Sequence, residues 1–153
     1  MSDQKRESVT NIFEAPLRHE VLPRGERWRY VDLSGEHLGV RIEAMAPGES
    51  SSEHHYHSME EEHVLIMEGA ATLVLGEAET ALKPGDHVWF PAGREVPHHI
   101  ENRSDADVKY LVFGERCAGD VVFYPKHQVM TVKGLGWKRL TYRPVATPDA
   151  AKS

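Results

Sequence analysis

The segment His54–Gly69 reads HHYHSMEEEHVLIMEG, and the fold and chemistry of the chain are organised around it. Its first ten residues hold four of the ten histidines of the chain and three consecutive glutamates. The apolar run 64–67 follows at once and leads to Gly69.

The secondary structure of this segment decides whether its histidines can act together. In a helix, residues two positions apart point to nearly opposite sides, so His55 and His57 could not share a metal ion. In a strand, alternate residues lie on one face and the two imidazoles converge. The turn signal Pro47-Gly48 before the histidines and the branched run 64–66 after them favour a strand. Two imidazoles and a nearby carboxylate then make a plausible set of ligands for a divalent metal.

Composition indicates an ordinary globular protein of one domain. The chain has 153 residues, with 40% hydrophobic and 27% charged side chains. Its formal net charge of -6, with no basic cluster, argues against partners such as nucleic acid or an anionic membrane. We see neither a signal peptide nor an apolar run near the ~20 residues of a membrane span. The single Cys117 cannot form an internal disulfide, so we expect a cytoplasmic protein.

Strands are expected about every ten residues between turns rich in Gly and Pro, and no stretch shows twelve residues of helical periodicity. Only a short helical turn is expected, at 125–129. The expected strands lie near Val21 and at 28–33, 37–45, 62–68, 71–75, 80–82, 87–90, 97–102, 108–113, 121–124 and 137–142. This pattern predicts an all-β sandwich or barrel. Residues 1–26 are interpreted as an extended arm, 27–143 as the barrel and 144–153 as a flexible tail.

The spacing of these residues resembles the cupin superfamily, whose first motif is G-x5-H-x-H-x(3 or 4)-E-x6-G. Gly48, His55, His57, Glu62 and Gly69 match it, with six residues in the first gap instead of five. Against this motif Glu62 fits the carboxylate position better than Glu61, which would leave seven residues before the last glycine. By the same comparison His54 is a neighbour of the site and not a ligand, because Tyr56 follows it at the second histidine position.

The second cupin motif, G-x5-P-x-G-x2-H-x3-N, matches Gly85, Pro91, Gly93, His98 and Asn102, with four residues instead of two before the histidine. The three-residue gap to the asparagine selects His98 over His99. The two motifs together cover about a third of the chain. The wider sequence is similar to small bacterial single-domain cupins. The resemblance implies a double-stranded β-helix, or jelly-roll barrel, with a ligand pocket at its mouth.

The resemblance implies that His55, His57, Glu62 and His98 hold one divalent metal ion, which could be Fe, Mn, Ni, Co or Zn. The alternative is a solvated polar loop whose histidines only look like ligands. Three neutral imidazoles and one carboxylate leave the centre with net charge +1, so we expect a small-molecule ligand that is an anion. Similar barrels commonly pair, and the apolar residues on both faces of 64–67 and 110–113 favour a homodimer.

The catalytic residues, if any, are unknown from the sequence; Glu60 and Tyr56 are weak candidates. Glu60 is expected to face solvent and Trp89 to lie in the core. The leading hypothesis is a metal-dependent enzyme acting on a small oxygenated or anionic metabolite, as a dioxygenase or by isomerase or lyase chemistry. The alternative hypothesis is a cupin that binds or senses a small molecule without turnover.

Overall fold

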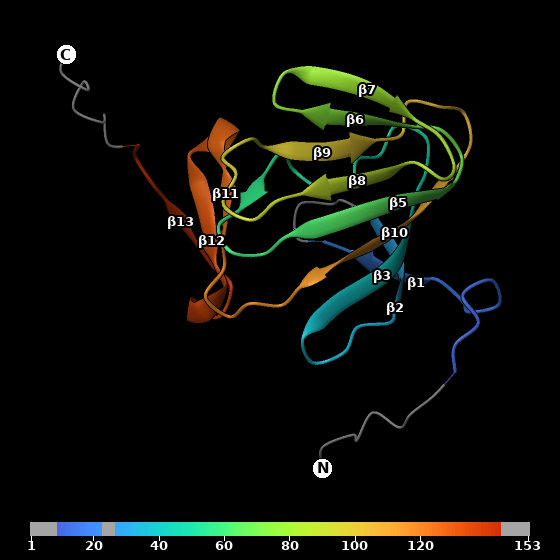
Figure 1. Ribbon diagram of the computed structural model, residues 1–153, viewed down its shortest axis with the longest axis horizontal. Helices are drawn as coiled ribbons and strands as arrows, with labels where there is room; N and C mark the ends of the chain where they lie inside the picture. Colours follow the sequence, from blue (N-terminus) through green and yellow to red (C-terminus); the bar gives the residue numbers. More distant parts are fainter. Residues whose placement is uncertain (1–8, 23–26, 145–153) are drawn as a thin grey trace.

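Three antiparallel sheets make up the computed structural model, which describes residues 9–22 and 27–144 (Figure 1). The six-stranded sheet has the order β1 (Arg18–Val21), β2 (Arg27–Asp32), β3 (Leu38–Met45), β10 (Val108–Glu115), β5 (Glu62–Glu68) and β8 (His87–Phe90). The three-stranded sheet has the order β7 (Ala78–Leu82), β6 (Ala71–Leu75) and β9 (His98–Glu101). The four-stranded sheet has the order β13 (Lys138–Thr141), β12 (Val129–Val132), β11 (Val121–Tyr124) and β4 (Tyr56–His57).

The hydrophobic core lies between the six-stranded and three-stranded sheets. Alternate residues of β10 point inward, so Val108, Tyr110 and Val112 are each less than one tenth exposed. Val64 and Ile66 of β5 continue this buried face. Side chains from both sheets complete one cluster: Met45, Ala71, Leu73, Leu82, Phe90 and Ile100. The closed apolar interior of a small barrel is the arrangement predicted from the sequence.

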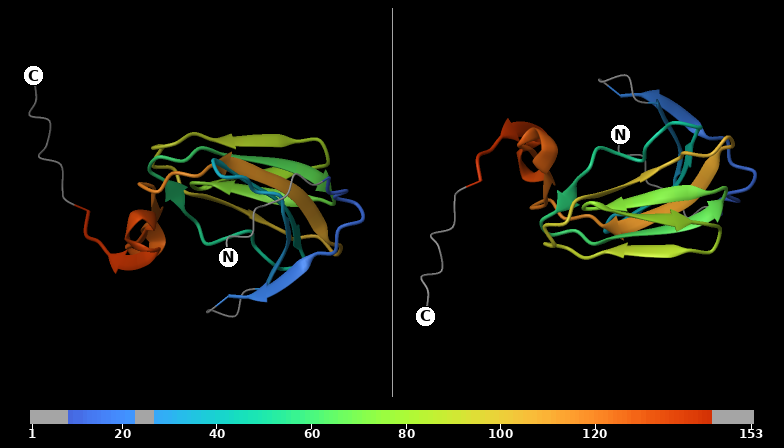
Figure 2. Two further views of the ribbon diagram at one scale, coloured as in Figure 1. Left: turned by 90° about the horizontal axis from the view of Figure 1, so that it is seen from below. Right: turned by 90° about the horizontal axis from the view of Figure 1, so that it is seen from above.

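The four-stranded sheet stands at one end of this barrel, where its β4 strand brings the histidine segment (Figures 1 and 2). β4 pairs with β11, with Val122 opposite His57 and Phe123 opposite Tyr56. Two 3-10 turns, η1 (Pro125–His127) and η2 (Lys133–Leu135), flank β12. The sheet therefore links the last third of the chain to the segment that carries the first two predicted ligands.

The all-β jelly-roll prediction is confirmed, and most predicted strands are present. β1 lies where a short strand was expected near Val21, and the helical turn after Tyr124 is η1. The strand β12 was missed because its residues were assigned to that turn and to the following loop. Residues 1–8 and 23–26 of the predicted arm and 145–153 of the predicted tail lie outside the described residues.

Trp89 is 55% exposed, so the prediction that it lies in the core is wrong. β8 places Phe90 inward and therefore turns its neighbour outward, because successive strand residues face opposite sides. The indole Nε1 donates a hydrogen bond to Glu61 Oε2 at 3.1 Å. This glutamate consequently belongs to the outer surface of the sheet.

Gly69 connects β5 to β6 with a backbone φ of 82°, and a Cβ there would lie 2.5 Å from the carbonyl oxygen of Asp107. We expect Gly69→Ala to lower the free energy of unfolding by about 3 kcal/mol or more, through backbone strain and this clash. Urea unfolding measures the loss. Gly48→Ala is a matched control, because Gly48 has φ 84° and no neighbouring heavy atom within 4 Å. It should lose only about 1–2 kcal/mol, and equal losses for the two variants would contradict the steric argument.

Candidate metal centre

Three segments far apart in the sequence meet at the end of the barrel nearest the four-stranded sheet. His55 and His98 face each other in an antiparallel bridge, with backbone N–H groups donating to the partner carbonyl at 3.2 and 2.8 Å. His57 lies in β4 and Glu62 is the first residue of β5. The histidine pair two positions apart does share one face, as the strand interpretation predicts.

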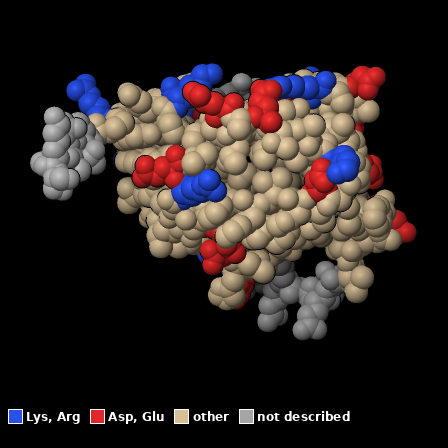
Figure 3. Space-filling view, turned by 45° about the horizontal axis from the view of Figure 1, so that its top comes forward, with Lys and Arg blue, Asp and Glu red and all other residues tan. Residues whose placement is uncertain are grey.

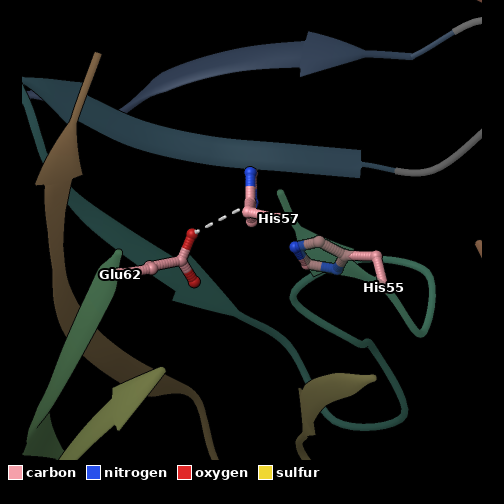
Figure 4. Close-up of side chains that lie close together, drawn as sticks. All are labelled: His55, His57 and Glu62. Carbon is pink, nitrogen blue, oxygen red and sulfur yellow. Dashed lines mark ion pairs between the residues drawn. The ribbon is translucent and has the colours of Figure 1, made fainter. Parts of the chain in front are cut away.

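The four predicted ligands lie together at this point. The coordinating atoms of His55, His57 and Glu62 all lie within 4.8 Å of one another (Figure 4). Glu62 Oε2 is 3.9 Å from His57 Nε2, and Glu62 Oε1 is 3.9 Å from His98 Nε2. The ring of His55 has its centroid 4.7 Å from that of His98. The structure thus brings His55, His57 and Glu62 within range of one ion and places His98 beside Glu62, and metal binding by the quartet stays a prediction.

Each histidine ring is held from behind by the protein. His55 Nδ1 lies 2.8 Å from the carbonyl oxygen of Glu53, which fixes the ring and leaves Nε2 for the centre. His57 Nδ1 lies 2.7 Å from Asp120 Oδ2. The ring of His98 stacks on Phe90 with 3.6 Å between centroids. Such outer contacts fix the tautomer and orientation of metal-binding imidazoles in proteins.

His98 Nε2 is buried and has no hydrogen-bond partner among the described residues. A buried polar nitrogen without a partner costs free energy, so such atoms are rare unless they serve another purpose. Here the orphaned nitrogen faces the carboxylate of Glu62. A lone pair on one side and an anionic oxygen on the other are the donors that a divalent cation requires, so the residues present fit a metal ion.

Burial keeps two of the imidazoles neutral. Desolvation, reinforced by neighbouring histidines, lowers the pKa of His55 to about 3 and that of His98 to about 2. Burial also raises the pKa of Glu62, although His57 and Arg41 oppose the shift. Neutral imidazoles retain the lone pairs that bind a metal, whereas a carboxyl group with a raised pKa gains most from a nearby cation.

A second acidic group lies behind His57, formed by Glu60, Asp120 and the ring itself. Lys133 already occupies it: its Nζ is 3.1 Å from Asp120 Oδ2 and donates a hydrogen bond to Glu60. Asp120 is fully buried and also accepts hydrogen bonds from Ser58 and the Met59 backbone. The ammonium group contacts both carboxylates and offsets one of their two charges, so this group supports His57 and is poorly suited to a second metal.

The expectation that Glu60 faces solvent is wrong, since the residue is 8% exposed. One of its oxygens accepts the backbone N–H of Cys117 at 2.6 Å and the other accepts from Lys133. Tyr56 stacks on Phe123, with 5.0 Å between ring centroids, and burial raises the pKa of its hydroxyl. Tyr56, Glu60, His57 and His98 all line a small hollow of about 20 Å³ that opens to solvent.

The residues set aside in the sequence have other contacts. His54 Nδ1 lies 2.7 Å from His99 Nδ1, and His99 Nε2 lies 2.7 Å from Glu101. Both histidines therefore have partners outside the quartet. Asp120 and Lys133 were missed, because each is a single polar residue in the last third of the chain and neither lies at a motif spacing.

The comparisons with known proteins agree with this arrangement. A family model described as a cupin domain, Cupin_2, matches residues 41–114. A cupin-superfamily sugar phosphate isomerase from Silicibacter pomeroyi is 29% identical and covers 81% of this chain and 85% of its own, with a TM-score of 0.72. A proposed sugar phosphate isomerase from Acidithiobacillus ferrooxidans is 27% identical and covers 89% and 93%, with a TM-score of 0.79.

A predicted oxalate decarboxylase from Thermotoga maritima shares the fold, with 20% identity, coverage of 72% and 100%, and a TM-score of 0.61. No curated protein sequence matches the chain. The family match spans β3 to β10, which includes all four residues of the quartet, and the solved structures extend the likeness over most of the chain. The chain therefore belongs to the cupin superfamily.

Proposed function

We propose that this protein is a metal-dependent enzyme that acts on a small oxygenated or anionic metabolite. His55, His57, Glu62 and His98 would hold one divalent ion, with Fe, Mn, Ni, Co and Zn all compatible with nitrogen and oxygen donors. Isomerase or lyase chemistry is favoured over dioxygenation, because two similar cupins are described as sugar phosphate isomerases. When bound, the ion supplies Lewis acidity that stabilises an oxyanion on the substrate.

The observation that carries the proposal is the unpartnered Nε2 of His98, buried opposite the Glu62 carboxylate. In a site built only for stability this nitrogen would have a hydrogen-bond partner. His57 Nε2 faces the same carboxylate of Glu62. The other ring nitrogen of His57, Nδ1, is hydrogen-bonded to Asp120. The chain therefore orients the rings, and burial keeps the imidazoles of His55 and His98 neutral.

A second candidate function is binding or sensing of a metabolite without turnover. Glu60 supports it, because Lys133 and the backbone of Cys117 occupy both carboxylate oxygens of this candidate base. Tyr56 supports turnover instead, since it lines the hollow and its protonated hydroxyl can donate a hydrogen bond to a substrate there, although the raised pKa makes it a weak acid. The two candidates thus differ in whether Tyr56 has a chemical role.

We expect a homodimer in the cytoplasm, with no nucleic-acid or membrane partner. Among the described residues, no helix is long and apolar enough to cross a membrane. On the face drawn in Figure 3, Lys and Arg side chains are interspersed with Asp and Glu and form no continuous basic area. Nucleic acid binding requires such an area, so a small anionic molecule is the partner we propose.

The function is tested by metal analysis and by solvent exchange on one preparation. We expect about one divalent ion per chain, and we expect His55→Ala and His57→Ala to lose it while remaining folded, because each removes a donor. Metal-loaded protein is incubated in D2O with sugar phosphates and sugar acids and followed by proton NMR. Deuterium at the carbon beside the carbonyl is expected for an isomerase that moves a proton.

His63→Ala is the matched control, because His63 lies on the outer face of β5 and stacks on Phe113. It should keep its metal and its exchange activity. Oxygen uptake without exchange would favour dioxygenation, and tight retention of a metabolite without either reaction would favour sensing. Full metal occupancy in both ligand variants would overturn the proposal.

Acid should destabilise the metal-free protein through its buried imidazoles. The folded pKa values of His55 and His98 are about 3 and about 2, whereas unfolded histidine titrates near ~6.5. The unfolded chain therefore binds more protons, so this stability is complete above about pH 6.5 and is lost as the pH falls. We expect a loss of about 2–3 kcal/mol per imidazole between about pH 7.5 and 4.5, measured by urea unfolding after EDTA treatment. His98→Gln should lose about half of this pH dependence; an unchanged slope would contradict the assignment.

The proposed dimer would use the outer face of the six-stranded sheet. Leu65, Leu111 and Phe113 are only half-buried there, beside the exposed Trp89. Covering such a face with a second copy removes apolar surface from water. We expect light scattering to give a dimer mass and Trp89→Glu to give a monomer mass. Leu135→Glu is the control, because Leu135 is 62% exposed on the four-stranded sheet side and should leave the dimer intact; a monomeric wild type would rule out the dimer.

A further inference from the structure

Arg41 lies on the inner face of the barrel, close to the proposed metal centre. It belongs to β3 and pairs with Val112 of β10, which in turn pairs with Val64 of β5. Cross-strand partners share a face, so Arg41 projects to the side on which Val112 and Val64 are buried. Glu62 lies two residues before Val64 and therefore projects to that side as well.

The guanidinium group of Arg41 is fixed from behind by a buried network. Its Nε donates a hydrogen bond to Glu43 Oε1 at 2.8 Å, and the Tyr110 hydroxyl donates to Glu43 Oε2 at 2.6 Å. Glu43 and Tyr110 are 5% and 2% exposed. The Arg41 Cζ also lies 5.1 Å from the centroid of the Trp28 ring. This carboxylate and ring hold the side chain in one orientation, which reduces the entropy lost when a ligand binds.

The outer edge of the guanidinium remains free. Within the described ranges 9–22 and 27–144, only Nε has an acceptor, and the side chain is 32% exposed. The two terminal nitrogens of Arg41 can therefore donate hydrogen bonds to a ligand that enters from solvent. Arg41 and Glu62 also attract each other electrostatically across the inner face of the barrel. An anion bound at this edge would lie near the metal ligands.

We propose that Arg41 is the anion anchor of this site and binds an oxyanion group of the substrate, a phosphate or a carboxylate, through its two terminal nitrogens. The proposal deepens the proposed function by naming the substrate class, and it rests on that function. The planar guanidinium has two parallel N–H donors that match two oxygens of a phosphate or of a carboxylate. The ammonium of a lysine has no such planar pair of donors. The oxygenated end of the substrate would then reach toward Glu62 and the imidazoles.

Two other cations near the site are less suited to this role. Lys133 is already bound to Glu60 and Asp120, so its charge is neutralised. Arg94 lines the hollow, but its side chain is exposed, and within the described part of the chain its guanidinium has no hydrogen-bond partner that would fix its position. An unfixed exposed side chain loses more conformational entropy on binding than a preorganised one. Arg41 alone of the three combines a fixed position with a free edge.

The test measures anion binding by calorimetry, with inorganic phosphate and malonate as separate probes. Wild type, Arg41→Gln and Arg41→Lys are each titrated with and without bound Mn(II). We expect Arg41→Gln to weaken binding roughly 10–100-fold, because the charged hydrogen bonds are lost. Arg41→Lys keeps the ion pair with Glu43 and should fold normally, yet it should still bind about tenfold more weakly because the planar pair of donors is gone.

Arg103→Gln is the matched control. It also removes one positive charge, but Arg103 is exposed and paired with Glu79 at the turn after β9. Its anion affinity should equal that of wild type. The probe that depends on Arg41 identifies the group, phosphate or carboxylate. Wild-type affinity for both probes in Arg41→Lys and Arg41→Gln would overturn the anchor.

The two proposals can fail separately. If no variant and no wild-type sample takes up Mn(II), the metal proposal fails, while the metal-free titrations still report on Arg41. If metal binds normally in the Arg41 variants and anion affinity does not change, only the anchor fails. With metal bound, the charge of Glu62 is offset, so wild type should bind either anion more tightly than the metal-free protein.

Discussion

The antiparallel bridge between His55 and His98 is the constraint on which the site depends. Its two backbone hydrogen bonds join the segment before β4 to the first residue of β9. A hydrogen bond of this kind contributes only about 1 kcal/mol to stability. Its larger effect is geometric, because it sets two imidazoles side by side in the barrel wall. Glu62 is the first residue of β5, which begins at the same end of the barrel, and its carboxylate lies 3.9 Å from His57 Nε2 and from His98 Nε2.

Two ion-paired groups lie in the polar interior around this bridge. Behind His57, Lys133 forms ion pairs with the buried carboxylates of Asp120 and Glu60. On the β3 side, Glu43 forms an ion pair with Arg41 and accepts a hydrogen bond from the Tyr110 hydroxyl. Buried charges are tolerated when they are paired and hydrogen-bonded. Among the described residues two buried side-chain nitrogens lack a hydrogen-bond partner, one on Arg29 and one on His98, and the nitrogen of His98 faces the Glu62 carboxylate.

The sequence predicted much of the fold and the position of the quartet, for physical reasons that can be named. Strand alternation places His55 and His57 on one face, and glycines such as Gly69, with positive φ, end strands where the chain must turn. Trp89 was misplaced because a four-residue strand of mostly apolar residues does not reveal which face is inward. Glu60 was misplaced because its partner Lys133 is more than seventy residues away, and one sequence carries no signal for such a pair.

His57 is divided between two parts of the molecule. Its Nε2 faces the barrel residue Glu62, whereas its Nδ1 is bound by Asp120, which lies beyond the segment that matches the cupin family. A fragment ending at Gly114 would retain every histidine and glutamate of the motif but not the group that sets the tautomer of this ring. Possession of the motif is therefore not equivalent to possession of a tuned centre. The orientation of His57 is therefore set by a residue just before β11, outside the segment that the family model matches.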